Sequence, residues 1–172
     1  MRSNDPSFAE LQSGGTAPLY TPEQRLRRDS SRWTLVQGIL APVQFLIFLI
    51  SLALVLNYLI TGTGAAAATI SIVVKTCALY AIMITGSIWE KIVFGKWLFV
   101  PAFFWEDVFS MLVLSLHTAY LVMLIGDYGT VRERMLLALV AYATYAINAT
   151  QFLLKLRAAR LQSAPARMVV TA

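Results

Sequence analysis

Residues 33–60 read WTLVQGILAPVQFLIFLISLALVLNYLI, a run of 28 residues without a charged side chain. A helix needs about 20 apolar residues to cross the hydrocarbon core of a bilayer. Three further charge-poor stretches follow at residues 66–89, 108–126 and 135–154, and their only ionisable interruptions within the membrane are Lys75 and His117. Glycines and Pro101 mark turns between the stretches. The sequence therefore predicts an all-α integral membrane protein, a four-helix antiparallel bundle with spans at about 33–60, 66–90, 103–126 and 131–156.

The composition narrows the class of protein further. Hydrophobic residues make up 58% of the 172-residue chain and charged residues 13%, against roughly 45–50% and about 25% in average soluble proteins. These values exclude a disordered chain and argue against a water-soluble globule. With one cysteine and one histidine, the chain lacks the residues for a disulfide scaffold, a zinc or iron–sulfur site, or a bis-histidine haem. We expect no metal site.

Lysine and arginine residues indicate the orientation in the membrane. Ten of them lie in the N-terminal flank, the second loop and the C-terminal flank, whereas the third loop holds only Arg132 and Arg134. Because basic loops stay on the cytoplasmic side, both termini are expected to be cytoplasmic. The net charge of +5 then reflects membrane topology, and we expect no nucleic-acid partner.

The expected domain organisation is simple. A single membrane domain is predicted at residues 21–161, between a disordered tail at 1–20 and a flexible tail at 162–172. Thr21, Pro22 and Gln24 have the pattern of a helix start with a capping box. The basic turn that follows is expected at the membrane surface, where anionic lipid attracts it.

Polar side chains recur along one face of every expected span. Taken span by span, they are Gln37, Gln44 and Ser51; Thr76, Tyr80, Ser87 and Glu90; Glu106, Ser110, His117 and Tyr120; and Thr144, Asn148, Gln151 and Lys155. We expect the four stripes to point inward, because lipid offers polar groups no partner. Two interpretations stay open: hydrogen bonds between helices, at roughly 0.6 kcal/mol each, or a polar cavity.

Three carboxyl groups and many aromatic rings surround the second loop. Glu90, Glu106 and Asp107 flank the turn of a helical hairpin, so they lie at the same depth and are expected to meet. Crowding and loss of water favour a protonated carboxyl group, which can serve as a general acid. The alternative is an aromatic belt at the lipid headgroups, which explains the tryptophans better than the acids.

Two ionisable side chains lie deeper in the membrane. His117 either hydrogen-bonds to a neighbouring helix or gives one axial ligand to a metal-centred macrocycle. A rise of roughly 16 Å along a helix separates it from Glu106, so one macrocycle is not expected to touch both. Lys75 is expected to have a structural role, reaching outward or pairing with Asp127.

Several long strings resemble the vinyl bacteriochlorophyllide hydratase family, over about residues 19 to 161. The strings that carry the resemblance are Trp33–Gly38, Ala41–Phe45, Ile84–Lys91, Pro101–Ser110, Tyr142–Tyr145, Asn148–Ala149 and Gln151–Lys155. Their length makes them more specific than a short motif.

The resemblance implies a hydro-lyase of bacteriochlorophyll biosynthesis. Such an enzyme adds water to the 3-vinyl group of chlorophyllide a or bacteriochlorophyllide (2-vinyl in older nomenclature), giving the 3-(1-hydroxyethyl) pigment. It implies no cofactor, and magnesium enters only as part of the pigment substrate. The implied partners are the pigment, water, the lipid bilayer and other pigment-biosynthesis enzymes. The implied location is the bacterial inner membrane, cytoplasmic or photosynthetic, as a multi-pass protein with both termini inside.

The chemistry of hydration suggests roles for the polar residues. The terminal vinyl carbon takes a proton, and the adjacent carbon becomes cationic before water attacks it. We assign the acid to Glu106, and the positioning of water and stabilisation of the cation to Glu90 or Asp107. Lys91, Lys96 or a C-terminal arginine is a candidate for holding the propionate carboxylate. The candidate substrate-binding residues are Trp89, Lys91, Phe104, Trp105, His117, Asn148 and Gln151.

Two other classes of protein remain as alternatives. A non-catalytic pigment-binding or assembly protein needs the aromatic pocket but not the clustered acids. A small transporter would use Lys75 and the carboxylates, although the sequence shows no internal repeat. The acids and the family-like strings favour the hydratase.

Overall fold

The computed structural model describes residues 19–163, with side chains through residue 158. Within this range the chain forms five helices: α1 (Pro22–Ser30), α2 (Arg32–Thr61), α3 (Ala65–Phe94), α4 (Phe104–Ile125) and α5 (Val131–Ser163). Four of them, α2 to α5, are long and apolar enough to cross a membrane. Most of the expected tails, residues 1–18 and 164–172, lies outside the described residues.

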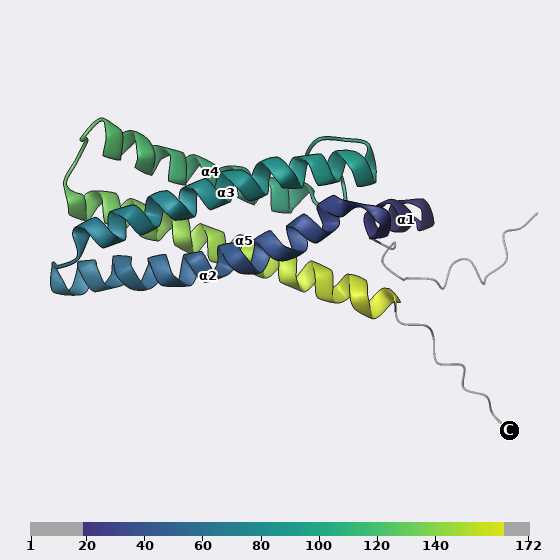
Figure 1. Ribbon diagram of the computed structural model, residues 1–172, viewed down its shortest axis with the longest axis horizontal. Coiled ribbons are helices and arrows are strands. Elements are labelled where there is room, and N and C mark those ends of the chain that lie inside the picture. Colours follow the sequence, from purple (N-terminus) through teal and green to yellow (C-terminus); the bar gives the residue numbers. More distant parts are fainter. Residues whose placement is uncertain (1–18, 164–172) are drawn as a thin grey trace, which may run out of the picture.

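The four long helices lie side by side, and the short helix α1 lies at one end of them (Figure 1). The connection between α3 and α4 and the last turns of α5 lie at this same end, which we call the α1 end. The turns from α2 to α3 and from α4 to α5 lie at the opposite end. Gly62 and Gly64, both with positive φ, allow α2 to end and α3 to begin within three residues.

Helix α1 starts with the capping box that the sequence predicts. The Thr21 hydroxyl accepts a hydrogen bond from the Gln24 backbone N–H at 3.2 Å, and the Gln24 side-chain oxygen accepts one from the Thr21 N–H at 2.9 Å. These bonds satisfy two backbone donors at the start of the helix. Tyr20, expected within the tail, is instead 4% exposed and packs against Phe94 and Phe103.

The polar stripes point toward the centre of the bundle, as expected, and seven of their fifteen members hydrogen-bond to a side chain on another helix. In order of the helices they join, the pairs are Gln37–Thr85, Ser51–Ser71, Ser51–Tyr142, Tyr80–Thr118, Ser110–Asn148 and Glu106–Lys155. Each pair joins two side chains on different helices. Because lipid cannot replace these bonds, they favour one mutual rotation of the helices over others.

Candidate active site

Three carboxyl groups converge at the α1 end. Glu90 lies one turn before the end of α3, and Glu106 and Asp107 lie in the first turn of α4. All three residues are buried, with exposed fractions between 4% and 6%. The hairpin of α3 and α4 therefore brings them to one depth, as the sequence predicts, although they do not form one cluster.

Glu106 faces α5 and forms an ion pair there. Its Oε2 accepts a hydrogen bond from the Lys155 ammonium group at 2.6 Å. The same ammonium nitrogen lies 5.0 Å from the centre of the Phe103 ring. A carboxyl group in an ion pair is ionised and has no proton to give, so Glu106 supplies fixed negative charge at the seam between α4 and α5.

Asp107 faces the opposite way, toward α3 and the loop. Its Oδ2 accepts a hydrogen bond of 2.7 Å from the backbone N–H of Phe99, a residue with a φ of +57°. The carboxyl group of Glu90 contacts that of Asp107 and lies within hydrogen-bonding reach of the Val100 backbone. Two ionised carboxylates in contact repel each other, so this arrangement is stable when the pair shares one proton. Glu90 Oε2 has no hydrogen-bond partner among the described residues.

An aromatic cluster packs around Phe103, the residue that precedes α4. The ring of Phe103 packs against those of Trp89, Phe94 and Phe152, with centroid distances of 5.8 to 6.0 Å. Tyr20 completes the cluster, and burial raises the pKa of its phenol. Trp89 is held in place because its Nε1 donates a hydrogen bond to the Thr34 hydroxyl at 2.9 Å. The cluster thus presents flat apolar walls beside the acids.

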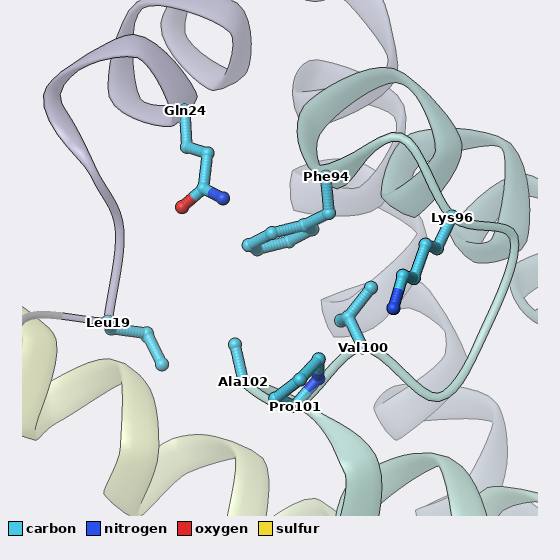
Figure 2. A pocket seen from close by; sticks show the side chains of 7 residues that line it. All are labelled: Leu19, Gln24, Phe94, Lys96, Val100, Pro101 and Ala102. Carbon is cyan, nitrogen blue, oxygen red and sulfur yellow. The ribbon is translucent and has the colours of Figure 1, made fainter.

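A cavity of about 220 Å³ opens beside this cluster. Its lining, shown in Figure 2, comes from α1, from the end of α3 and from the loop: Leu19, Gln24, Phe94, Lys96, Val100, Pro101 and Ala102. Val100 connects the cavity to the acids, because its backbone faces Glu90 while its side chain lines the cavity. Drug-sized ligands occupy cavities of roughly 300 to 1,000 Å³, so this space is smaller than a site that encloses a whole ligand of that size.

Polar side chains continue from Glu106 along the seam between α4 and α5. Asn148 donates a hydrogen bond from its Nδ2 to the Ser110 hydroxyl at 2.8 Å. Gln151 lies between Asn148 and Lys155 on α5 and lines a shallow groove of about 360 Å³ with Ala146, Ile147, Thr150 and Leu154. The candidate substrate-binding residues Asn148 and Gln151 thus lie on the face of α5 that also carries Lys155, the partner of Glu106.

A family model described as 2-vinyl bacteriochlorophyllide hydratase matches residues 20–158. The chain belongs to this family. It is 67% identical to the 2-vinyl bacteriochlorophyllide hydratase of Cereibacter sphaeroides over 145 residues, which is 83% of this chain and 89% of that protein. It is 63% identical to the enzyme of the same name from Rhodobacter capsulatus over 146 residues, 85% of each chain. No solved structure matches it.

In this member of the 2-vinyl bacteriochlorophyllide hydratase family, three of the expected binding residues point away from the acids. Phe104 and Trp105 are 44% and 66% exposed on the outer surface of α4. The Lys91 ammonium group donates to the Gly95 carbonyl at 3.0 Å and lies over the Trp97 ring. Their positions suit the aromatic belt that was the alternative interpretation. Phe103, one residue earlier, takes the place that was expected for Phe104.

The hydratase-family bundle also holds a second, deeper polar layer. His117 Nδ1 hydrogen-bonds to the Val113 carbonyl at 2.8 Å, and no described residue bonds to its Nε2. Lys75 is fully buried, and its ammonium nitrogen lies 3.6 Å from the centre of the Tyr145 ring. The expectations that Lys75 reaches outward or pairs with Asp127 are wrong, since Asp127 pairs with Arg134 at 3.0 Å instead.

Sequence reasoning missed several residues of this site. Tyr20, Phe103 and Phe152 build the aromatic cluster, and Gln24 lines the cavity. Phe103 is one of several aromatic residues between α3 and α4, and nothing in the sequence distinguishes it from its neighbours. Within the described part of the chain, no group of three or more histidine, cysteine or acidic side chains is placed to hold a metal ion.

Proposed function

We propose that this chain is a hydro-lyase of bacteriochlorophyll biosynthesis. It adds water to the 3-vinyl group (2-vinyl in older nomenclature) of chlorophyllide a or bacteriochlorophyllide, and the product carries a 3-(1-hydroxyethyl) group. Membership of the hydratase family supports the reaction class. The observation that carries the assignment to this site is the burial of three carboxyl groups against one aromatic cluster. Magnesium belongs to the pigment substrate, and we propose no resident cofactor.

The reaction needs an acid and a base that act on neighbouring carbons. A proton passes to the terminal vinyl carbon, which becomes a methyl group, while the π electron pair forms the new C–H bond. The adjacent carbon becomes cationic, stabilised by the conjugated ring and by nearby negative charge. A water oxygen then bonds to that carbon, and a carboxylate accepts the proton that the water releases. One water is consumed and the total charge is unchanged. Where the acid and the base are different carboxyl groups, the proton that the base gained returns to the acid before the next turnover.

The contacts of the three carboxyl groups suggest a division of these roles. The Glu90–Asp107 pair shares a proton, and the hydrogen bond from the Phe99 N–H favours the charged form of Asp107, so the proton lies on Glu90, which makes Glu90 the acid. Glu106, ionised by Lys155, supplies the negative charge that stabilises the cation and accepts the proton from water. These roles are the reverse of those expected for Glu106 and Glu90. The reason is the ion pair with Lys155, which favours a Glu106 carboxylate without the proton that an acid needs.

The distribution of basic residues supports an orientation with the site at the cytoplasmic surface. Arg25, Arg27, Arg28, Lys91 and Lys96 all lie at the α1 end. By the positive-inside tendency, we propose an antiparallel bundle in the bacterial inner membrane with both termini cytoplasmic. An amphipathic pigment then enters from the inner leaflet, with its ring against the aromatic cluster and its propionate near Lys96.

Hydration can be measured directly with labelled water. Membranes containing the protein are incubated with 3-vinyl chlorophyllide in water enriched in oxygen-18, and the pigment is analysed by chromatography and mass spectrometry. The expected product is heavier by one labelled water, and its absorption is shifted to the blue because the vinyl group has left the conjugated system. Pigment that binds and is recovered unchanged would instead favour a non-catalytic pigment-binding or assembly protein.

Matched variants separate the roles of the carboxyl groups. Glu90→Gln is expected to lower the hydration rate at least about 100-fold, the usual contribution of a general acid, with pigment affinity retained. Glu23→Gln, on the exposed surface of α1, is the control and should leave the rate unchanged. A Glu90→Gln variant with a normal rate would refute the acid assignment. If Glu106→Gln loses activity while Glu90→Gln keeps it, the acid role returns to Glu106.

A further inference from the structure

Two amide oxygens on α5 are buried without a bonding partner. Neither Asn148 Oδ1 nor Gln151 Oε1 accepts a hydrogen bond from any described residue. The two residues are three positions apart on one helix, so their side chains lie on the same face, one above the other. Buried polar atoms of this kind are ordinarily satisfied by a ligand or an ordered water. The pair therefore marks a place for a small hydrogen-bond donor.

The direction of one of these oxygens is set by its neighbours. Asn148 Nδ2 donates to the Ser110 hydroxyl at 2.8 Å, and this bond turns Oδ1 away from Ser110. Ser110 lies one helical turn from Glu106, and Gln151 lies one turn from Lys155, the partner of Glu106. Four residues correspond to a rise of about 6 Å along a helix. The amide oxygens thus lie on the Glu106 seam, one turn deeper in the bundle.

The chemistry of the substrates identifies the donor. A magnesium tetrapyrrole has no N–H group, and the rim of its ring offers only C–H groups and acceptor oxygens. Water, the second substrate, donates two hydrogen bonds. A water that gives one hydrogen to each amide oxygen presents its lone pairs away from α5, which is the orientation that a nucleophile needs.

We infer that Asn148 and Gln151 hold the water that adds to the alkene, with Glu106 placed to accept its proton. This inference rests on the proposed hydratase function and goes beyond the carboxyl groups already assigned. The oxygen–carbon bond forms on the side of the ring that faces α5. As it forms, one hydrogen of the water turns from its amide oxygen to the Glu106 carboxylate, which accepts it as a proton, while the other hydrogen stays on the new hydroxyl group. Asn148 and Gln151 are positioning residues, because they act on the pigment only through the water.

The configuration of the new hydroxyethyl carbon reports where the attacking water lies, independently of the reaction rate. Protonation of the terminal carbon creates a methyl group, which is not a stereocentre. The adjacent carbon becomes a stereocentre, and its configuration depends only on the face that the water attacks. Since the ring has other stereocentres, the two products are diastereomers that reversed-phase chromatography separates. The inference predicts one epimer in clear excess from the unaltered protein.

The test uses Gln151→Met and Asn148→Leu, which remove an amide oxygen with little change in side-chain size. Gln151 Oε1 has no protein bond to lose, so Gln151→Met keeps the test valid if Asn148→Leu fails to fold. The matched control is Thr150→Val, because Thr150 lines the same groove and its hydroxyl bonds to the Ala146 carbonyl of its own helix. Full-length proteins in membranes are assayed for rate, epimer ratio and pigment binding by absorption.

The expected result for Gln151→Met is a rate about 100-fold lower, an epimer ratio near 1:1 and unchanged pigment affinity. Thr150→Val should match the unaltered protein in all three measurements. An unchanged epimer ratio in Gln151→Met, whatever its rate, would overturn the inference. Equal epimers from the unaltered protein would also overturn it and leave the hydratase function standing. Pigment that binds to the unaltered protein but is never hydrated would overturn the proposed function, and the inference with it.

Discussion

Lys75 and Lys155 differ in what faces their ammonium groups. Lys155 meets the Glu106 carboxylate at 2.6 Å, whereas Lys75 meets the rings of Tyr145 and Phe48, at 3.6 and 5.9 Å from their centres. A cation over an aromatic ring gains up to about 2 kcal/mol, while removing an ammonium group from water costs several kcal/mol. Lys75 is therefore a net cost to stability, and Lys155 is one half of a compensated pair.

Lys75→Met is expected to stabilise the protein by about 1–3 kcal/mol, the usual cost of a buried polar group without a hydrogen bond. Methionine has a similar length and keeps contact with the Tyr145 ring. The measurement is the thermal or denaturant unfolding transition of detergent-solubilised protein. A lower transition temperature for Lys75→Met would contradict this and show that the Lys75 ammonium group has a compensating partner in the folded protein.

The same substitution at Lys155 should have the opposite effect. Lys155→Met leaves the Glu106 carboxylate buried without a counter-charge. Because the Lys155 side chain is 27% exposed, water compensates in part, and we expect a loss of about 1–3 kcal/mol rather than the 3–5 kcal/mol of a fully buried pair. The double variant Lys155→Met with Glu106→Gln should recover stability. A double variant no more stable than Lys155→Met would contradict this.

At the scale of elements, the connection between α3 and α4 depends on the first turn of α4. Gly95 ends α3 with a φ of +80°, and Phe99 has a φ of +57°, a conformation that side chains disfavour. The hydrogen bond from the Phe99 N–H to Asp107 holds this residue in place. The loop in turn carries Val100, which lies between the cavity and Glu90. Asp107 thus has a structural task besides its contact with Glu90.

Asp107→Ala is expected to loosen this loop and speed trypsin cleavage after Lys96, an exposed residue within it. Asp107→Asn is the matched control, because its amide oxygen can still accept from the Phe99 N–H. Inside-out membrane vesicles present the loop to the protease if the α1 end is cytoplasmic. Equal cleavage of Asp107→Ala and the unaltered protein would show that Asp107 does not hold the loop.

At the scale of the whole molecule, the charges of the two ends differ. The α1 end gathers Arg25, Arg27, Arg28, Lys91 and Lys96. The opposite end holds a turn of uncharged residues, 62–64, the ion pair of Asp127 with Arg134, and one further residue of each charge, Arg132 and Glu133. The surface between the ends exposes large apolar side chains on all four long helices. An asymmetric charge distribution around an apolar middle is what orients a protein in a bilayer.

Cysteine labelling tests the proposed orientation. With the exposed Cys77 replaced by serine, Thr63→Cys and Lys96→Cys place single thiols at opposite ends of the bundle. A membrane-impermeant maleimide added to spheroplasts should label Thr63→Cys and spare Lys96→Cys, and lysis should make Lys96→Cys reactive. The reverse pattern would place the active site on the periplasmic side.

Properties that depend on local pattern could be predicted from the sequence alone. Four charge-poor stretches of sufficient length predicted four helices, and the polar residues at helical spacing predicted which faces turn inward. The capping box of α1 follows from Thr21 and Gln24, which are neighbours on the chain. The shared depth of Glu90, Glu106 and Asp107 follows from their places beside one hairpin turn. Each of these features is set by residues close in sequence or by the hydrophobic length of a helix.

Only the tertiary structure decided which side chains of the site contact each other. Neighbouring residues on a helix point about 100° apart, so the rotation of α4 in the bundle determines that Glu106 faces Lys155 while Asp107 faces Glu90. The same rotation brings Phe103 into the aromatic cluster and turns Phe104 and Trp105 outward. Helix rotation results from the summed packing and hydrogen bonds of all the helices, which no single stretch of sequence contains. The sequence therefore determined which residues carry the chemistry, and the packing of the helices determined which of them act together.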